Sequence, residues 1–320
     1  TESGHALEVF GISQNFSFPT VYAARKKWLD ASLENANWKL WAAQNKALAS
    51  TSRAFYTYMY ADQMLQINEQ KLVYYQRFVD MARRKITLGE STKLELLTAQ
   101  TALKQSQNDL INYTQQRALA LDELQRFTGV EWLNPIYDYD KELFEAEVDL
   151  ESIRALIQSE VTMAQGELKL AKSNFAPDVS VNVFRGVDPL ASDKNYDGIQ
   201  LGLSVPLFYG AQKSQLKVAQ SKLSAIRIQS DDKIAQQEAE FETLLELVRA
   251  ESVWLDQFET EMQDTFDSVL KIAMRSYETG NLSFSDFVSL INQAYQLRAQ
   301  YLERFLSYHL HVSQLKFPTL

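Results

Sequence analysis

The chain has 320 residues, a net charge of −9 and no cysteine. The negative charge argues against a nucleic-acid-binding surface, which needs clustered Lys and Arg, and the lack of cysteine excludes disulfides, thiolate catalysis and cysteine-ligated zinc. No stretch approaches the roughly 18 consecutive apolar residues of a transmembrane helix. Only 10 glycines and 6 prolines interrupt the sequence, so we expect long, unbroken helices.

The first part of the chain predicts a strand, a very long helix, a turn and a second helix. An alternating segment begins near Ala6 and meets Pro19, a residue tolerated at a helix start because its missing N–H has no helical partner there. The helical pattern then runs from about Thr20 to Thr87, roughly 100 Å at 1.5 Å per residue. Gly89 is expected to provide a positive-φ turn between antiparallel helices. In the next helix, a 3-then-4 spacing predicts a seam of coiled-coil type, formed by Leu96, Ala99, Leu103, Ser106, Leu110 and Tyr113.

The middle of the chain predicts a linker, a helix and a strand hairpin. The linker covers residues 129–148, and Asp149–Asn174 carries one apolar stripe at helical spacing. Two alternating segments follow, Asp178–Arg185 and Gly198–Phe208, separated by a polar loop over residues 186–197. Strands of this length are typical of membrane-barrel hairpins.

The last part repeats the pattern of the first. A long helix is expected from about Tyr209 to Thr279, and Gly280 follows as a second turn. The final helix again shows a seam at 3-then-4 spacing, formed by Phe287, Leu290, Ala294, Leu297, Tyr301 and Arg304.

An internal duplication relates these parts. Gly11–Lys26 and Gly198–Lys213 align at an offset of 187, with both prolines among the identical positions. Arg84–Gly89 and Arg275–Gly280 align at an offset of 191, which predicts a net insertion of four residues in the second long helix.

The duplication divides the chain into three parts. Residues 1–128 form the first repeat, residues 129–148 the linker, and residues 149–320 the second repeat. By comparison with the second repeat, the first lacks the upstream helix and the first strand of the pair.

Three features together resemble the outer-membrane efflux protein family, of which TolC is the best-known member. One is the entry into a long helix at Val205–Gly210, another is the turn sequence Gly89–Gln100, echoed at Gly280–Asn292, and the third is the duplication itself. The first entry, Gln14–Tyr22, is similar to the heavy-metal branch of CusC and CzcC type. In that branch some channels are fused behind a CusA- or CzcA-type inner-membrane pump.

The resemblance implies a mainly α fold with a small β part. Three protomers would form an α-barrel of long helical hairpins across the periplasm and a β-barrel in the outer membrane of a Gram-negative cell. It implies a passive channel for heavy-metal cations or small toxic compounds, with no enzymatic activity and no cofactor. The implied partners are a periplasmic adaptor and an inner-membrane pump of RND type, separate or fused. Only three of the four strands that the family contributes per protomer are found here.

The resemblance also implies which residues line the narrow periplasmic end. Glu95 and Asp286 lie six positions after Gly89 and Gly280, where the family carries an acidic residue that faces the lumen, and Tyr277 matches a tyrosine of the gate. The alternative reading makes the two acids solvated or first-turn capping carboxylates, and Tyr277 a packing aromatic. The glycine turns would be the place where the adaptor docks.

One element of the family's gate is absent. The arginine expected two residues after the second turn glycine is replaced by Leu282. Arg84 and Arg275, five residues before each glycine, are read as substitutes for that arginine or as surface charges.

Two other classes of protein stay open on the residues alone. A soluble coiled-coil scaffold would explain the helices but not the strands at matching points of both repeats. A periplasmic adaptor would need one helical hairpin inside a β-rich domain. The three histidines are too few and too scattered for a metal site, and no catalytic triad or phosphate loop is present.

Overall fold

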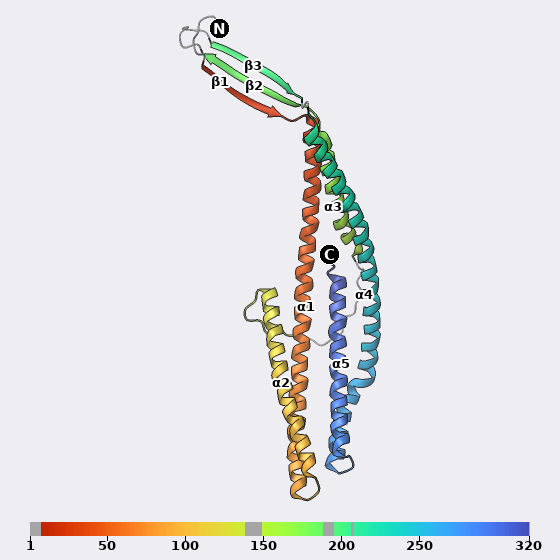
Figure 1. The fold of residues 1–320 in the computed structure, drawn as a ribbon. Coiled ribbons are helices and arrows are strands. Elements are labelled where there is room, and N and C mark those ends of the chain that lie inside the picture. The colour runs from red at the N-terminus through yellow and green to blue at the C-terminus, as the bar shows by residue number, and fades with distance from the viewer. Residues whose placement is uncertain (1–7, 138–148, 188–194, 206–207, 320) are drawn as a thin grey trace. The chain divides into compact units, whose positions relative to one another are not determined.

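The computed structural model describes residues 8–137, 149–187, 195–205 and 208–319 (Figure 1). The chain is mainly helical with one small antiparallel sheet, which confirms the predicted fold class. In chain order the elements are β1 (Glu8–Phe16), α1 (Pro19–Thr87), α2 (Lys93–Thr128), α3 (Leu150–Ser173), β2 (Asp178–Val187), β3 (Asn195–Ser204), α4 (Gly210–Glu278) and α5 (Phe284–Lys316).

The chain forms two compact units. The first comprises residues 1–41 and 150–237, and the second comprises residues 42–149 and 238–320. Each unit therefore contains part of each predicted repeat, and α1 and α4 each contribute to both units.

The two longest helices, α1 and α4, have 69 residues each. α1 begins at Pro19, whereas α4 begins at Gly210, four positions after the equivalent Pro206. This later start offsets the predicted four-residue insertion, so the two helices are equal in length. Within the described part of the chain, no helix is both long enough and apolar enough to cross a membrane.

The sheet gathers apolar side chains on one face. β2 lies between β1 and β3 and is antiparallel to both, with Ile12 opposite Val183 and Val183 opposite Ile199. Because directly opposed residues point to the same side, this register aligns a set of apolar residues, namely Phe10, Ile12, Phe16, Val179, Val181, Val183, Ile199, Leu201 and Leu203. Ile12 is 80% exposed and Leu201 is 74% exposed, so nothing in the described chain covers this face. At its loop end Arg185 and Asp197 form a two-pronged ion pair, at 2.6 and 2.8 Å.

The strand bounds differ from those predicted. β2 continues to Val187 and β3 begins at Asn195, because main-chain pairing extends into the polar segment without needing apolar side chains. β3 ends at Ser204 rather than Phe208, since the chain then enters Pro206, which has no N–H for a ladder bond. Ala6, the predicted start of β1, lies outside the described residues.

In the first unit, α3 packs closely against the beginnings of the long helices. Gly166 permits this approach, because a Cβ atom placed there would lie 3.0 Å from the Cα of Trp28 in α1. The buried Asn35 amide donates a 2.8 Å hydrogen bond to the Ser159 hydroxyl, so two polar groups satisfy each other inside the contact.

In the second unit, the helical hairpins α1–α2 and α4–α5 share one apolar core. At its centre Phe78 of α1 is fully buried and stacks on Phe287 of α5, with ring centroids 4.4 Å apart. Tyr75 of α1 also donates a 2.7 Å hydrogen bond to Asn292 of α5. The first hairpin therefore contacts α5 directly.

This contact changes the seam predicted for α5. Phe287 and Ala294 are buried as expected, but Arg304 is exposed, with its guanidinium 5.2 Å from the Trp254 ring centroid. Because α5 packs against α1 as well as α4, it buries a wider stripe than one seam. The additional buried apolar residues include Ile291, Tyr295, Leu302 and Phe305.

Candidate functional site at the helical tips

Both helical hairpins turn through the same main-chain motif. Gly89 has φ +75° and Gly280 has φ +77°, in the left-handed region that glycine adopts without strain. At the first turn the N–H of Glu90 donates to the Lys85 carbonyl at 2.8 Å, and the Gly89 N–H donates to the Ile86 carbonyl at 3.0 Å.

At the second turn Asn281 and Gly280 make the equivalent bonds to Ser276 and Tyr277. This pair of bonds is the Schellman motif. The positive-φ turns predicted at the two glycines are confirmed. We call residues 84–95 the first tip and residues 275–286 the second tip.

The two candidate acids occupy equivalent capping positions. Thr92 is the N-cap of α2 and accepts from the Glu95 N–H at 3.3 Å, while Ser91 donates its hydroxyl to the Glu95 carboxylate. Ser283 caps α5 by accepting from the Asp286 N–H at 3.2 Å, and its hydroxyl contacts the Asp286 carboxylate at 2.6 Å. Each carboxylate is thus held in the first helical turn, where the helix dipole favours negative charge.

Tyr277 lies inside the apolar core. Its side chain is only 2% exposed, and its ring contacts Phe78 and Phe287 with centroids 5.0 and 5.2 Å away. Burial, and secondly the negative charge of Glu95, raise the pKa of the Tyr277 hydroxyl. Among the described atoms this hydroxyl has no hydrogen-bond partner. The structure therefore shows Tyr277 packing as an aromatic residue of the core.

A residue that the sequence does not single out links the two tips. The Lys85 ammonium of α1 donates a 2.9 Å hydrogen bond to the main-chain carbonyl of Tyr277 in α4. It also lies over the Tyr277 ring, 4.2 Å from the centroid. Arg84 and Arg275, the predicted substitutes for the missing arginine, are both exposed. Leu282 packs against the shared core.

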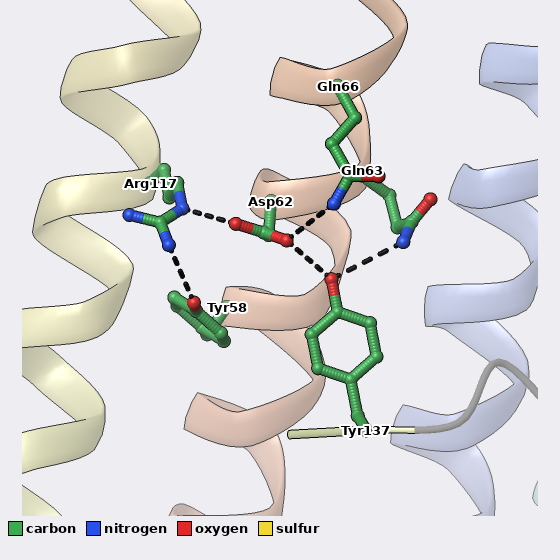
Figure 2. Close-up of polar contacts among 6 residues, drawn as sticks. All are labelled: Tyr58, Asp62, Gln63, Gln66, Arg117 and Tyr137. Carbon is green, nitrogen blue, oxygen red and sulfur yellow. Dashed lines mark hydrogen bonds and ion pairs between the residues drawn. The ribbon is translucent and has the colours of Figure 1, made fainter. Parts of the chain in front are cut away.

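A polar cluster on the first hairpin binds Tyr137, which lies in the segment that follows α2 (Figure 2). Asp62 of α1 pairs with Arg117 of α2, and it accepts hydrogen bonds from Tyr137 at 2.7 Å and from Gln66 at 2.8 Å. Arg117 also donates to the Tyr58 hydroxyl at 2.9 Å.

Electrostatics decide the ionisation state of this cluster. Burial by itself would raise the pKa of Asp62, but the hydrogen bonds from Tyr137 and Arg117 and the Arg117 charge together hold it below its ordinary value. The same bond works in the opposite sense on Tyr137, since burial and donation to Asp62 both raise the pKa of its hydroxyl. Asp62 is therefore ionised, and its main partners are the Arg117 guanidinium and the Tyr137 hydroxyl.

Within the described part of the chain, no group of three or more His, Asp or Glu side chains could hold a metal ion. The tips instead contain one capping carboxylate each, a lysine that contacts the other hairpin, and part of the aromatic core.

Comparison with known proteins finds one family match. Residues 21–130, which span nearly all of α1 and the whole of α2, match the model of the outer membrane efflux protein family. No curated protein sequence matches the chain significantly.

Solved structures of outer membrane channels share the fold. CmeC of Campylobacter jejuni superposes with a TM-score of 0.82 at 11% identity, over 98% of this chain and 76% of CmeC. VceC of Vibrio cholerae gives a TM-score of 0.74 at 15% identity, over 96% of this chain and 86% of VceC. CusC gives 0.78 at 14% identity, over 97% of this chain and 82% of CusC.

Sequence reasoning located the two glycine turns and the acids in the first turns of α2 and α5, because both are local signals. It missed Lys85 and the Asp62 cluster. No local signal marks a lysine that reaches a carbonyl of another helix, although its repeat partner Ser276 shows that the two tips differ at this position.

Proposed function

We propose that the chain is the protomer of a passive, trimeric efflux channel of the outer membrane, with its tips in the periplasm. The observation that carries the proposal is the exposed apolar face of the three-stranded sheet, in a chain whose residues 21–130 match the outer membrane efflux protein family. β1 and β3 each leave one edge unpaired in the described chain. Because unpaired edges are costly in lipid, strands of neighbouring protomers would have to close the sheet.

The expected assembly is a trimer that requires detergent for extraction. We expect the mass of the solubilised particle, corrected for bound detergent, to be three times that of the 36.7 kDa chain. Replacing Ile12 and Leu201 with Asp should prevent insertion into the membrane, whereas the same change at Ser13 and Gln200, on the opposite face, should be tolerated. A monodisperse monomer that stays in solution without detergent would refute this proposal.

The tips are proposed to form the narrow end of the channel. Glu95 and Asp286 are proposed to face the lumen, where three copies of each would bring six carboxylates near one axis and favour cations. The capping bonds do not oppose this role, because each carboxylate has two oxygens and several lone pairs. Tyr277 would shape the constriction by packing from within the protomer. The Gly89 and Gly280 turns are proposed to receive the adaptor.

Charge removal at the two acids should lower cation selectivity. In planar bilayers we expect Glu95→Gln with Asp286→Asn to reduce the cation-to-anion permeability ratio several-fold and to weaken block by multivalent cations. These changes keep hydrogen-bonding capacity at the caps. Glu151→Gln is the matched control, since Glu151 is also a first-turn acid, in α3. Unchanged selectivity in the double variant would place both carboxylates outside the pore.

The proposed substrates are heavy-metal cations or small toxic compounds, delivered by an RND-type pump through a periplasmic adaptor, with the pump separate or fused. The support for metal cations is the similarity of Gln14–Tyr22 to the heavy-metal branch and the net charge of −9. Metal sensitivity of a strain lacking the protein, compared with its sensitivity to organic toxins, distinguishes the two substrate classes.

A further inference from the structure

The second unit contains a largely apolar cavity that the proposed channel function does not use. The cavity has a volume of about 520 Å³ and lies between α1, the ends of α2 and α5, and the segment that follows α2. We infer that it is a binding site for a small aromatic carboxylate, which Ser313 and Lys316 orient. The inference does not depend on the channel function, because every residue that lines the cavity belongs to one compact unit of a single chain.

The size and the walls of the cavity suit a small aromatic molecule. Small-molecule sites are typically pockets of about 300–1,000 Å³, mainly apolar and with few polar groups. On one wall the Tyr56 ring stacks on His309 with ring centroids 4.3 Å apart, and Phe55 meets Tyr56 edge-on at 5.3 Å. Leu124 and Val312 add aliphatic surface. A planar aromatic ligand can therefore make the stacked or edge-to-face contacts that aromatic rings prefer.

Ser313 supplies a hydroxyl that has no hydrogen-bond partner among the described atoms. The residue is 4% exposed and lines the cavity. Serines inside helices often donate to a carbonyl of the preceding turn, as the buried Ser159 donates to Leu156 at 2.6 Å. Because a buried hydroxyl without a partner is costly, a ligand acceptor that Ser313 reaches by rotating about χ1 would remove that cost.

Lys316 gives the cavity a preference for an anion. It lies three residues after Ser313 and therefore on the same face of α5. Among the described residues that line the cavity, no other is a Lys, Arg, Asp or Glu. The hydroxyls of Thr51 and Thr128 also belong to the lining, but each donates to a carbonyl of its own helix at 2.9 Å. A carboxylate can accept from both the Ser313 hydroxyl and the Lys316 ammonium, and bonds of this charged kind are the stronger ones.

The test compares two probes that share the same rings, 2-naphthoate and its neutral counterpart naphthalene-2-methanol. Isothermal titration calorimetry measures their binding to the detergent-solubilised full chain, and a titration of protein-free detergent is subtracted. Ser313→Ala removes the hydroxyl and Lys316→Met removes the charge. Ser106→Ala is the matched control for the first, since Ser106 is 1% exposed and its hydroxyl also has no partner among the described atoms, but it does not line the cavity. Lys46→Met is the control for the second, because Lys46 is an exposed lysine of α1 outside the cavity.

A hydrogen bond to a charged group contributes enough to change an affinity about ten-fold. We expect Ser313→Ala and Lys316→Met each to weaken the binding of 2-naphthoate by about this factor, and the neutral probe to bind the wild type more weakly to a similar extent. Ser106→Ala and Lys46→Met should keep the wild-type affinity. The inference is overturned if 2-naphthoate does not bind the wild type, if the two probes bind equally well, or if the control variants lose as much affinity.

Thermal unfolding without a probe separates a binding function of Ser313 from a structural one. Removing an unpaired buried hydroxyl should not destabilise the fold, so Ser313→Ala should melt at or slightly above the wild-type temperature, as Ser106→Ala should. A lower melting temperature of Ser313→Ala together with unchanged affinity for 2-naphthoate would make the hydroxyl a structural group and contradict the inference.

The mass of the particle shows whether a second copy of the chain fills the cavity instead. We expect 2-naphthoate to bind the detergent-solubilised protein whatever its oligomeric state. Binding to single chains but not to larger assemblies would identify the cavity as an interface between copies and overturn the inference. Binding to a particle that proves to be monomeric supports the ligand site and counts against the trimeric channel.

Discussion

Replacing Phe78 with alanine should lower the free energy of unfolding by about 3–5 kcal/mol. The side chain is fully buried and stacks against aromatic rings of the other hairpin, so its removal leaves a cavity that rigid rings cannot fill. Denaturant titration of the detergent-solubilised protein, followed by circular dichroism, measures the change. Because Phe78 joins the two hairpins, the variant should also dissociate their tips before the helices melt.

Val73→Ala is the control for this prediction. Val73 lies on the same helix but is 52% exposed, so its truncation should change the free energy of unfolding by less than about 0.5 kcal/mol. A loss below 1 kcal/mol on truncating Phe78 would mean that the hairpins do not pack through this residue.

Replacing Asp62 with asparagine should cost about 2–3 kcal/mol, since it leaves Arg117 without its anion and weakens the bond from Tyr137. This free-energy cost is lower than that of breaking a fully buried ion pair, because the Arg117 side chain is 34% exposed and partly hydrated. Asp80→Asn is the matched control. Asp80 lies on the same helix, is 47% exposed and pairs only loosely with Arg83, at 3.9 Å.

The Asp62 contribution should also depend on pH. Its pKa is lower in the folded chain than the ordinary value of 3.8, so folding favours the ionised form. The stabilisation is therefore complete above the unfolded-state pKa and is lost as the pH falls through the lower folded-state pKa. Between pH 6 and pH 3 the wild type should lose more stability than Asp62→Asn. Parallel curves would show that the carboxylate is not stabilised by its partners.

Much of the fold was predictable because it rests on local signals. The starts and ends of α1 and α4, the glycine turns and the capping acids follow from proline, glycine and first-turn chemistry, and the duplication doubled each signal. The strand hairpin was predictable for the same reason, since alternating apolar and polar residues indicate a strand with one apolar and one polar face.

What escaped prediction depends on which helix faces which. Periodicity places Asp62 and Arg117 on helix faces but cannot show that these faces meet. The wider buried stripe of α5, with Ile291 and Leu302, arises because that helix has two neighbours. The contact of Lys85 with the other hairpin is still harder to predict, since its acceptor is a main-chain atom that every residue has.

The pairing of β1 with β2 has a consequence for the order of synthesis. Phe10 lies opposite Arg185, 175 residues later in the chain. At translation rates of about 5–20 residues per second, the first strand therefore waits roughly 10–35 seconds for its neighbour. During that interval β1 is an apolar segment with two unpaired edges, on which other chains can pair and aggregate. The nascent protein should accordingly need a chaperone that binds extended apolar segments, and need it first for residues 8–16.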